Sequence, residues 1–397
     1  MHNLRTPCFI LDKQELLRSI NGFQTALTNN FAKSIVGYSV KTNSLPYALA
    51  LAKDEGCFAE VVSYDEYHLA IECGFSPKHI IYNGPMKSKE TFLDCIRGGG
   101  IVNIETHREL KWLEELPKEN VYNVGIRLNI NITHVSPEDA DGENDNSRFG
   151  FSDDTEEFAN AIKCILSLKN IRLTGLHIHR TAHSRSVRFY KESIRYACNI
   201  IKKYGLTLDN LDVGGGYFGI FPNKPTYQQY AEAFKEVLLS YGLEDLCIIV
   251  EPGNALVASC FSFISEVIDV KHVEEDRWFV TTDGSRNDID PFFRKTDYIK
   301  EIFTDGNRQK VKEQIVSGCT CLEYDRMFTL KDYPLLKEGD RILYHNVGAY
   351  TMCLTPMFIR YIPNVYLKDN NGYTLIREAW TAKEYIQKSM LQDSNKE

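Results

Sequence analysis

The prediction of the fold starts from the stretch Ser34-Ile35-Val36-Gly37-Tyr38-Ser39-Val40-Lys41-Thr42-Asn43. Its apolar, β-branched start predicts a strand that is buried on both faces. The predicted strand ends on Lys41, and a helical pattern follows from Leu45 to Lys53. A lysine at the rim of a buried strand can be partly desolvated, which lowers the pKa of the amine and frees it to attack carbonyl carbons. A solvated lysine at a strand end is the alternative.

Apolar runs and helical patterns alternate from this stretch as far as Glu251. The runs that predict strands end near Lys41, Ser63, Asn83, Glu105, Asn129, His179, Asp212 and Glu251. Patterns of helical period separate them, for example at residues 64–73, 87–97, 107–116, 155–168, 188–203 and 227–241. Strands that alternate with helices favour a parallel sheet, and eight such units are typical of a closed (β/α)8 barrel. We therefore expect an α/β fold with a TIM-like barrel over residues 25–255.

After Pro252 the alternation stops. Residues 262–270, 277–282, 314–317, 341–345 and 372–376 predict strands without long helices between them. They indicate a second, mostly antiparallel β domain made of residues 1–24 and 256–397, which an N-terminal strand at residues 5–12 joins. The segment 287–307 is too polar to assign.

Composition excludes several classes of function. The net charge of −8 argues against a protein that binds nucleic acid polymers. No apolar run approaches the length of a membrane span, and residues 1–5 lack the apolar core of a signal peptide, so we expect a cytoplasmic protein. The 11 cysteines favour reduced thiols over a disulfide framework. Cys319-Thr320-Cys321 lacks the second pair of a zinc site, and we expect no metal site.

Polar side chains gather where the predicted barrel strands end. They are Lys41, residues 60–63, Asn83, Arg127, His177, His179, residues 212–216 and Glu251. The active site of such a barrel lies at the carboxyl ends of its strands. A polar side chain buried at the end of a strand costs free energy unless it has a hydrogen-bonding or functional partner. The pattern therefore predicts a single site at this end of the barrel.

With Tyr38 to Asn43 at the end of the first barrel strand, the chain resembles the fold-type III pyridoxal-phosphate decarboxylases over nearly its whole length. This group contains diaminopimelate, ornithine and arginine decarboxylases. The resemblance implies that the chain binds pyridoxal 5′-phosphate and that Lys41 forms the Schiff base. The other residues that it assigns to the cofactor are Glu60, Arg127, His179 in Gly-Leu-His-Ile-His, Gly214, Gly215 and Gly216 in Asp-Val-Gly-Gly-Gly, Glu251 and Gly253 in Glu-Pro-Gly, and Tyr350 in Gly-Ala-Tyr.

Each implied role has a physical reason. A carboxylate at position 251 would keep the pyridine nitrogen protonated, and the cofactor ring could then accept the electrons left by a departing CO2. Glycines let backbone N–H groups close on a phosphate without interference from a Cβ. Cys321, by resemblance, would return a proton to Cα.

Two further matches concern assembly. In the family, a loop with the cysteine that matches Cys321 comes from a dimer partner, so the resemblance implies a homodimer with shared active sites. Arg148 in Arg-Phe-Gly and Asp325 match residues that pair across that dimer. A solvated surface arginine remains the alternative for Arg148.

The chain departs from the family mainly in substrate recognition. Diaminopimelate decarboxylases carry an arginine after Glu-Pro-Gly, where this chain has Asn254, and a second one before a proline, where it has Asp290. The acid that usually follows the cysteine is Leu322, and the serine expected after the histidine is Ala182. Neither Asn nor Asp can replace a planar arginine fork as a grip for carboxylates. Free diaminopimelate is therefore disfavoured.

A run of cationic residues follows the sixth predicted barrel strand. It contains Arg180, His183, Arg185 and Arg188. We interpret Arg180, His183 and Arg185 as a clamp that binds an anionic group of the substrate. The alternative is that these charged side chains lie at the start of a helix and face water. With the clamp, the substrate would be an amino acid inside a larger anionic conjugate. Two precedents in the family are siderophore enzymes that act on a citryl-diaminopropionate and microcin C-type enzymes that trim an aminocarboxypropyl group on a nucleotide phosphate.

Three other functions stay open. The first is a decarboxylase of a free amino acid of the diaminopimelate type. The second is an alanine-type racemase, which Glu251 disfavours because racemases of this fold pair the pyridine nitrogen with arginine. The third is a non-catalytic homologue that binds the cofactor or a regulator.

Overall fold

Parallel strands close into a ring in the unit formed by Leu16–Val257. The computed structural model describes residues 3–140, 142, 147–274 and 276–389. In order around the ring, the strands are β2 (Ser34–Ser39), β3 (Phe58–Ser63), β4 (Ile80–Met86), β5 (Ile101–Ile104), β6 (Tyr122–Asn129), β8 (Ile171–Ile178), β9 (Asn210–Asp212) and β10 (Cys247–Val250). Pairing of β10 with β2 closes the ring, and the two-residue β7 (Phe151–Ser152) pairs with β6. The predicted eight-stranded barrel is confirmed.

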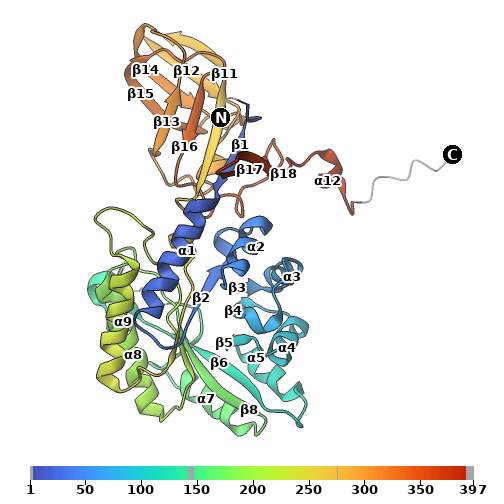
Figure 1. The fold of residues 1–397 in the computed structure, drawn as a ribbon, viewed down its shortest axis with the longest axis vertical. Helices are drawn as coiled ribbons and strands as arrows, with labels where there is room; N and C mark the ends of the chain where they lie inside the picture. The colour runs from blue at the N-terminus through green and yellow to red at the C-terminus, as the bar shows by residue number, and fades with distance from the viewer. Residues whose placement is uncertain (1–2, 141, 143–146, 275, 390–397) are drawn as a thin grey trace, which may run out of the picture. The chain divides into compact units, whose positions relative to one another are not determined.

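Helices cover the outside of this ring (Figure 1). They are α2 (Pro46–Asp54), α3 (Tyr64–Glu72), α4 (Lys89–Arg97), α5 (His107–Trp112), α6 (Ile132–Val135), α7 (Glu157–Ser167), α8 (Val187–Tyr204), α9 (Tyr227–Tyr241) and α10 (Asn254–Val257). The described residues of this unit also form the short 3₁₀ turns η1 (Val40–Thr42), η2 (Pro77–His79), η3 (Leu113–Glu115) and η4 (Pro137–Asp139). The boundary between the two units of the chain falls within α1 (Lys13–Thr28).

The helix α8 illustrates why these segments are helical. Ile194, Ala197 and Ile201 recur at helical spacing and are buried. Ser186 caps the first turn by accepting a hydrogen bond from the Phe189 amide, and Gly205 ends the helix in the left-handed conformation. Local capping and the buried stripe therefore specify the same helix.

Lys41 differs slightly from its predicted place. The strand β2 ends at Ser39, and Lys41 lies in the turn η1 just beyond it. The chain turns there because Asn43 accepts a hydrogen bond from the Leu45 amide, and Pro46 then begins α2. The lysine is thereby carried past the strand, at the carboxyl end of the barrel.

The second unit, Met1–Glu15 with Ala258–Glu397, is a mixed and mostly antiparallel β structure, as the fold class predicted. Its strands are β1 (Cys8–Asp12), β11 (Phe261–Glu274), β12 (Arg277–Thr282), β13 (Lys300–Phe303), β14 (Lys310–Ser317), β15 (Arg326–Pro334), β16 (Arg341–Tyr344), β17 (Asn364–Asp369) and β18 (Gly372–Arg377). Its short helices are α11 (Arg286–Ile289) and α12 (Ala382–Ile386). The strand β1 lies antiparallel to β11 and parallel to β17. The segment left unassigned in the sequence, 287–307, contains most of α11 and all of β13.

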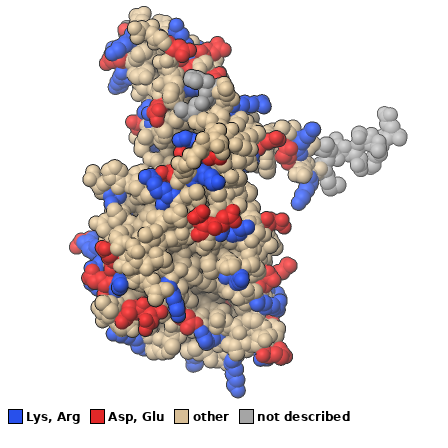
Figure 2. Space-filling view, in the orientation of Figure 1, with Lys and Arg blue, Asp and Glu red and all other residues tan. Residues whose placement is uncertain are grey.

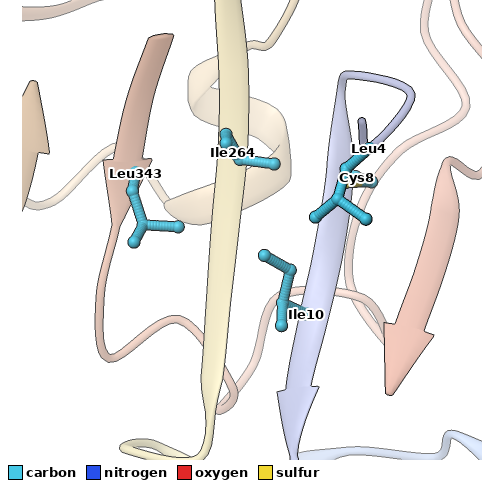
Figure 3. Close-up of a cluster of buried hydrophobic side chains, with 5 residues drawn as sticks. All are labelled: Leu4, Cys8, Ile10, Ile264 and Leu343. Carbon is cyan, nitrogen blue, oxygen red and sulfur yellow. The ribbon is translucent and has the colours of Figure 1, made fainter. Parts of the chain in front are cut away.

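One part of the core of the β unit lies around β1. Cys8 and Ile10 of β1, with Leu4 before them, are buried with Ile264 of β11 and Leu343 of β16 (Figure 3). Alternate residues of a strand share a face, so Cys8 and Ile10 present one apolar row to the neighbouring strands. Burial of this row ties the start of the chain to strands that come more than 250 residues later.

Acidic and basic side chains are interspersed on the surface of each unit in the face shown in Figure 2. Within the described part of the chain, every helix is too short or too polar to traverse a lipid bilayer.

Candidate active site

Lys41 and Glu60 form a close ion pair at the carboxyl end of the barrel. The Lys41 Nζ lies 2.5 Å from Glu60 Oε2, and the same oxygen accepts a hydrogen bond of 2.6 Å from Ser39 Oγ. The Lys41 side chain is 33% exposed whereas Glu60 is 1% exposed. The amine is therefore held by a buried carboxylate while it stays accessible to a small molecule.

Asn83 lies between two buried carboxylates. Its Nδ2 donates to Glu60 Oε1 at 3.2 Å and to Glu251 Oε1 at 2.5 Å. Its Oδ1 accepts a hydrogen bond of 2.9 Å from Asn103 Nδ2. These contacts connect Lys41 to Glu251 through Glu60 and one amide. The sequence places Asn83 at a strand end but assigns it no role, because nothing in the local pattern shows which carboxylates it meets.

Glu251 is buried against two further polar groups. His177 Nε2 lies 3.5 Å from Glu251 Oε2. A ring nitrogen of His177 and one carboxylate oxygen each of Asp212 and Glu251 all lie within 4.8 Å of one another. Burial raises the pKa of Asp212 well above its usual range, and the neighbouring Glu251 charge adds to this. Burial also opposes ionisation of Glu251, but the His177 and Lys41 charges outweigh it and hold the pKa of Glu251 below its usual value. Of the two acids, Glu251 therefore carries the charge.

The glycine loop after β9 is held against His179. The Gly215 amide donates a hydrogen bond of 3.0 Å to His179 Nδ1, and the Glu251 amide donates one of 2.7 Å to the Gly214 carbonyl. Burial, with the nearby Arg127 charge, lowers the pKa of His179 well below its usual value. A neutral imidazole whose Nδ1 accepts a hydrogen bond carries its proton on Nε2.

The loop has no room for side chains at two of its glycines. A Cβ at Gly214 would lie 2.4 Å from His179 Nδ1, and one at Gly215 would lie 2.2 Å from the Glu251 carbonyl oxygen. Gly214 and Gly216 also have positive φ angles of +67° and +97°. The Gly214 amide donates to Asp212 Oδ1 at 2.9 Å and the Gly215 amide to His179 Nδ1, so these two amides are already engaged. The lack of Cβ atoms still lets an anion approach the backbone of the loop closely.

Arg127 supports the site from β6. Its Nη1 donates to Glu105 Oε2 at 2.8 Å and its Nη2 donates to the His179 carbonyl oxygen at 3.3 Å. Burial opposes ionisation of Glu105, but Arg127 and the buried Lys87 outweigh it and lower the pKa of Glu105. Both Nη atoms of the guanidinium are thus engaged with protein groups, which fixes the backbone at His179, just after β8.

The cationic run after β8 divides into two parts. The charge of Arg188 is neutralised within the protein, because its guanidinium pairs with Glu138 and with Asp139, the latter at 3.1 Å. Arg185 instead stacks on Phe218, with its Cζ 5.2 Å from the ring centroid, and its carbonyl accepts a hydrogen bond of 2.7 Å from Tyr230. Arg180 and His183 precede it in the same loop. The sequence could not show that Arg188 is neutralised, because its partners lie about 50 residues away.

Phe218 carries a second cation that the sequence did not single out. Lys224 Nζ lies 4.7 Å from the centroid of the same ring. Among the described residues, no carboxylate pairs with Arg185 or Lys224. Because Phe218 is the second residue after Gly216, these two cations lie beside the glycine loop.

The remaining predicted site residues lie in the β unit. Cys321 is exposed, Leu322 is half-buried, and Tyr350 is exposed with a positive φ of 55°. Asp325 is buried and accepts hydrogen bonds from Ser285 Oγ, the Arg286 amide, and the amide and hydroxyl of Thr320. This carboxylate therefore organises the loop that carries Cys321.

Asp290 is also satisfied within its own turn. It accepts hydrogen bonds from Arg286 Nη2, the amides of Arg294 and Lys295, and the Tyr298 hydroxyl. Burial opposes its ionisation, but Arg286 and these amides outweigh burial and lower its pKa. Arg148 of the barrel unit is exposed and stacks on Phe149, with its Cζ 4.5 Å from the ring centroid. Pairing of Arg148 with Asp325 across a dimer stays a prediction.

The residues of the barrel unit fit pyridoxal 5′-phosphate. They supply an accessible amine at Lys41, a buried ionised carboxylate at Glu251, a histidine at His179, and a glycine loop without room for side chains. A phosphate can approach a loop backbone closely where Cβ atoms are absent, and a pyridine nitrogen needs an anion to stay protonated. The expectation that the chain has no metal site stays a prediction.

Comparison with known proteins gives a consistent result. The family model described as "Pyridoxal-dependent decarboxylase, pyridoxal binding domain" matches residues 17–258. A probable chloroplastic diaminopimelate decarboxylase of Oryza sativa subsp. japonica is 27% identical over 396 residues, which cover 96% of this chain and 79% of the relative. The L-glutamyl-[BtrI acyl-carrier protein] decarboxylase of Niallia circulans is 25% identical over 388 residues, which cover 90% of this chain and 88% of the relative.

Solved structures share the fold. The diaminopimelate decarboxylase of Methanocaldococcus jannaschii superimposes with a TM-score of 0.85 over 98% of this chain and 93% of its own, at 24% identity. The arginine decarboxylase of Paramecium bursaria Chlorella virus gives a TM-score of 0.75 over 92% of this chain and 97% of its own, at 20% identity.

Proposed function

Because the chain belongs to the pyridoxal-dependent decarboxylases, we propose that it removes the α-carboxylate of an amino-acid moiety held within a larger anionic conjugate. The cofactor is pyridoxal 5′-phosphate, which supplies an electron-accepting ring when it is bound. Lys41, whose amine pairs with Glu60 in this structure, would hold it covalently. Glu251 would keep the pyridine nitrogen protonated, and the glycine loop would hold the phosphate.

The observation that carries the substrate class is the cation pair of Arg185 and Lys224 at Phe218. Both cations lie beside the glycine loop, and no described carboxylate neutralises them. In a protein of net charge −8, two unpaired cations beside the active site favour an anionic ligand. Arg180 and His183, in the same loop as Arg185, complete the proposed clamp.

The substitutions in substrate-recognition positions support the same proposal. Asp290 replaces an arginine of diaminopimelate decarboxylases. Its carboxylate accepts hydrogen bonds from Arg286 and from the Lys295 amide of the following turn. Asn254 and Leu322 likewise lack the charges that would grip a free diamino acid. The Niallia circulans relative acts, by its name, on a glutamyl group bound to a carrier protein, which is a further precedent for a conjugated substrate.

The test compares CO2 release from four compounds. They are a citryl-diaminopropionate, a nucleotide with an aminocarboxypropyl phosphate ester, carrier-bound L-glutamate and free meso-diaminopimelate. We expect release from at least one of the first three and little from the fourth. Release from diaminopimelate alone would contradict the conjugate and support the second candidate, which the relatives named diaminopimelate decarboxylase favour.

Removing the cation pair is the corresponding mutational test. We expect Arg185→Ala and Lys224→Ala each to raise KM for the conjugate by about tenfold with little change in kcat, since each removes a charged contact to the anion. Lys202→Ala is the matched control, because Lys202 stacks on Tyr241 at 4.4 Å but lies on α8 away from the loop. An unchanged KM in both variants would refute the clamp.

The two remaining functions are separated by simple measurements. A racemase would invert Cα without releasing CO2. A non-catalytic homologue would show the absorbance of the bound cofactor, lost in Lys41→Ala, without turnover of any of the four compounds.

We also propose a homodimer with shared active sites. Cys321 would return a proton to Cα in the partner's site, and Tyr350 would contact the cofactor phosphate. The exposed side chain of Cys321, at the tip of a loop held by Asp325, suits such a contribution.

A further inference from the structure

Asn83 has an unusual position among the polar groups of the barrel. It is buried on β4, 2% exposed, and each hydrogen of its side-chain NH2 group points to a different carboxylate. Two neighbouring carboxylates such as Glu60 and Glu251 repel each other. A neutral amide that donates to both offsets this repulsion and adds no charge. An aspartate at this position would place a third acid in the same space.

The orientation of this amide is set by Asn103. Asn103 Nδ2 donates to Asn83 Oδ1 at 2.9 Å, so the carbonyl side of Asn83 is occupied and its NH2 side must face the two acids. Space for Asn103 is provided by Gly125, where a Cβ would lie 2.1 Å from Asn103 Oδ1. The Asn103 side chain fits only because residue 125 has no side chain.

The two carboxylates that Asn83 joins have separate tasks in the proposed function. Glu60 Oε2 holds the Lys41 amine, and Glu251 is the buried anion of the site. We propose that Asn83 is a positioning residue that fixes Glu60 and Glu251 relative to each other, so that the lysine amine and the anion facing the cofactor ring keep one geometry. This rests on the proposed function, because it assigns both acids to the bound cofactor.

Asn83→Leu tests the role, since leucine keeps the number and branching of the side-chain heavy atoms and removes both donated hydrogen bonds. We expect the absorbance maximum of the bound cofactor and the 15N resonance of its pyridine nitrogen to shift relative to wild type. We expect kcat to fall by about tenfold or more while KM changes little, because misplaced catalytic groups affect the reaction more than binding. Asn83→Asp should shift the same resonance, since it replaces donors by an acceptor.

Asn170→Leu is the matched control for loss of a buried amide. Asn170 is 5% exposed and donates to the carbonyls of Leu116 and Pro117, remote from these acids. We expect it to lower the melting temperature and leave the cofactor spectrum and kcat unchanged. The proposal is overturned if Asn83→Leu behaves like Asn170→Leu. A wild-type protein without cofactor absorbance would instead refute the proposed function.

A double variant tests the part of Asn103. If Asn103 acts only through Asn83, then Asn103→Ala alone should shift the cofactor spectrum in the direction of Asn83→Leu. Adding Asn103→Ala to Asn83→Leu should then change kcat no further. Additive losses in kcat would overturn the orienting role of Asn103.

Discussion

Gly214 and Gly242 have the same backbone angle in different surroundings. Both have a φ of +67°. A Cβ at Gly214 would meet His179 Nδ1 at 2.4 Å, whereas one at Gly242 would have nothing within 4 Å. The cost of the left-handed conformation, about 1 kcal/mol, is common to both positions. Only Gly214 adds a clash with a site residue.

We therefore expect Gly214→Ala to weaken cofactor binding by about tenfold or more, because His179 and the loop must move apart. The measurement is titration of the apoprotein with pyridoxal 5′-phosphate, followed by absorbance. Gly242→Ala should lower the melting temperature and leave the cofactor affinity unchanged. Equal affinities in the two variants would show that the loop tolerates a side chain.

At the scale of elements, the start of α3 carries an acid that burial makes difficult to ionise. Ser63 caps the helix by accepting from the Glu66 amide, and Glu66 Oε2 accepts a hydrogen bond of 2.8 Å from the Val62 amide. Burial raises the pKa of Glu66 to about 7, with the Glu60 charge as a further cause. The folded protein thus binds this proton more tightly than the unfolded chain does.

The sign of the pH dependence follows from this shift. Stability from Glu66 is present at low pH, where both states are protonated, and is lost as pH rises through the folded pKa of about 7. Glu66→Gln keeps an acceptor for the Val62 amide and cannot ionise. We expect it to stabilise the apoprotein by up to about 3 kcal/mol near pH 8 and to leave the stability unchanged near pH 4, with thermal unfolding as the measurement. A constant difference across this range would contradict the assignment.

The elements also show which parts of the molecule the sequence could predict. Period and strand ends located the barrel and placed Lys41, His179 and Glu251 at one end of it, because these signals are local. Contacts between distant residues are not local, so the bridge from Asn83 to Glu251, 168 residues apart, was not predictable. The strand β13 was missed because Lys300 and Glu301 make it half polar.

At the scale of the whole molecule, the proposed homodimer can be tested by complementation. Lys41→Ala would inactivate one site and Cys321→Ala would impair the partner's site, so a mixed dimer would keep one intact site if the two residues come from different subunits. We expect co-expression of the two variants to restore about a quarter of wild-type activity, since half of the dimers are mixed.

The neighbouring thiol provides the control for this experiment. Cys319→Ala should keep activity in homodimers, because Cys319 is half-buried and burial raises the pKa of its thiol. Absence of activity after co-expression, with both single variants folded, would place both residues in the same subunit's site.

The insertion of the barrel between two pieces of the β unit has a consequence for synthesis on the ribosome. The strand β1 leaves the exit tunnel before the barrel is made, when its partners β11 and β17 are still untranslated. At about 5–20 residues per second, the roughly 250 residues in between take on the order of 12–50 seconds to appear. During that interval the apolar residues Cys8 to Leu11 have no partner strand with which to pair. A circular permutant that begins at Ala258 and joins the original ends would translate the β unit as one piece and shorten that wait.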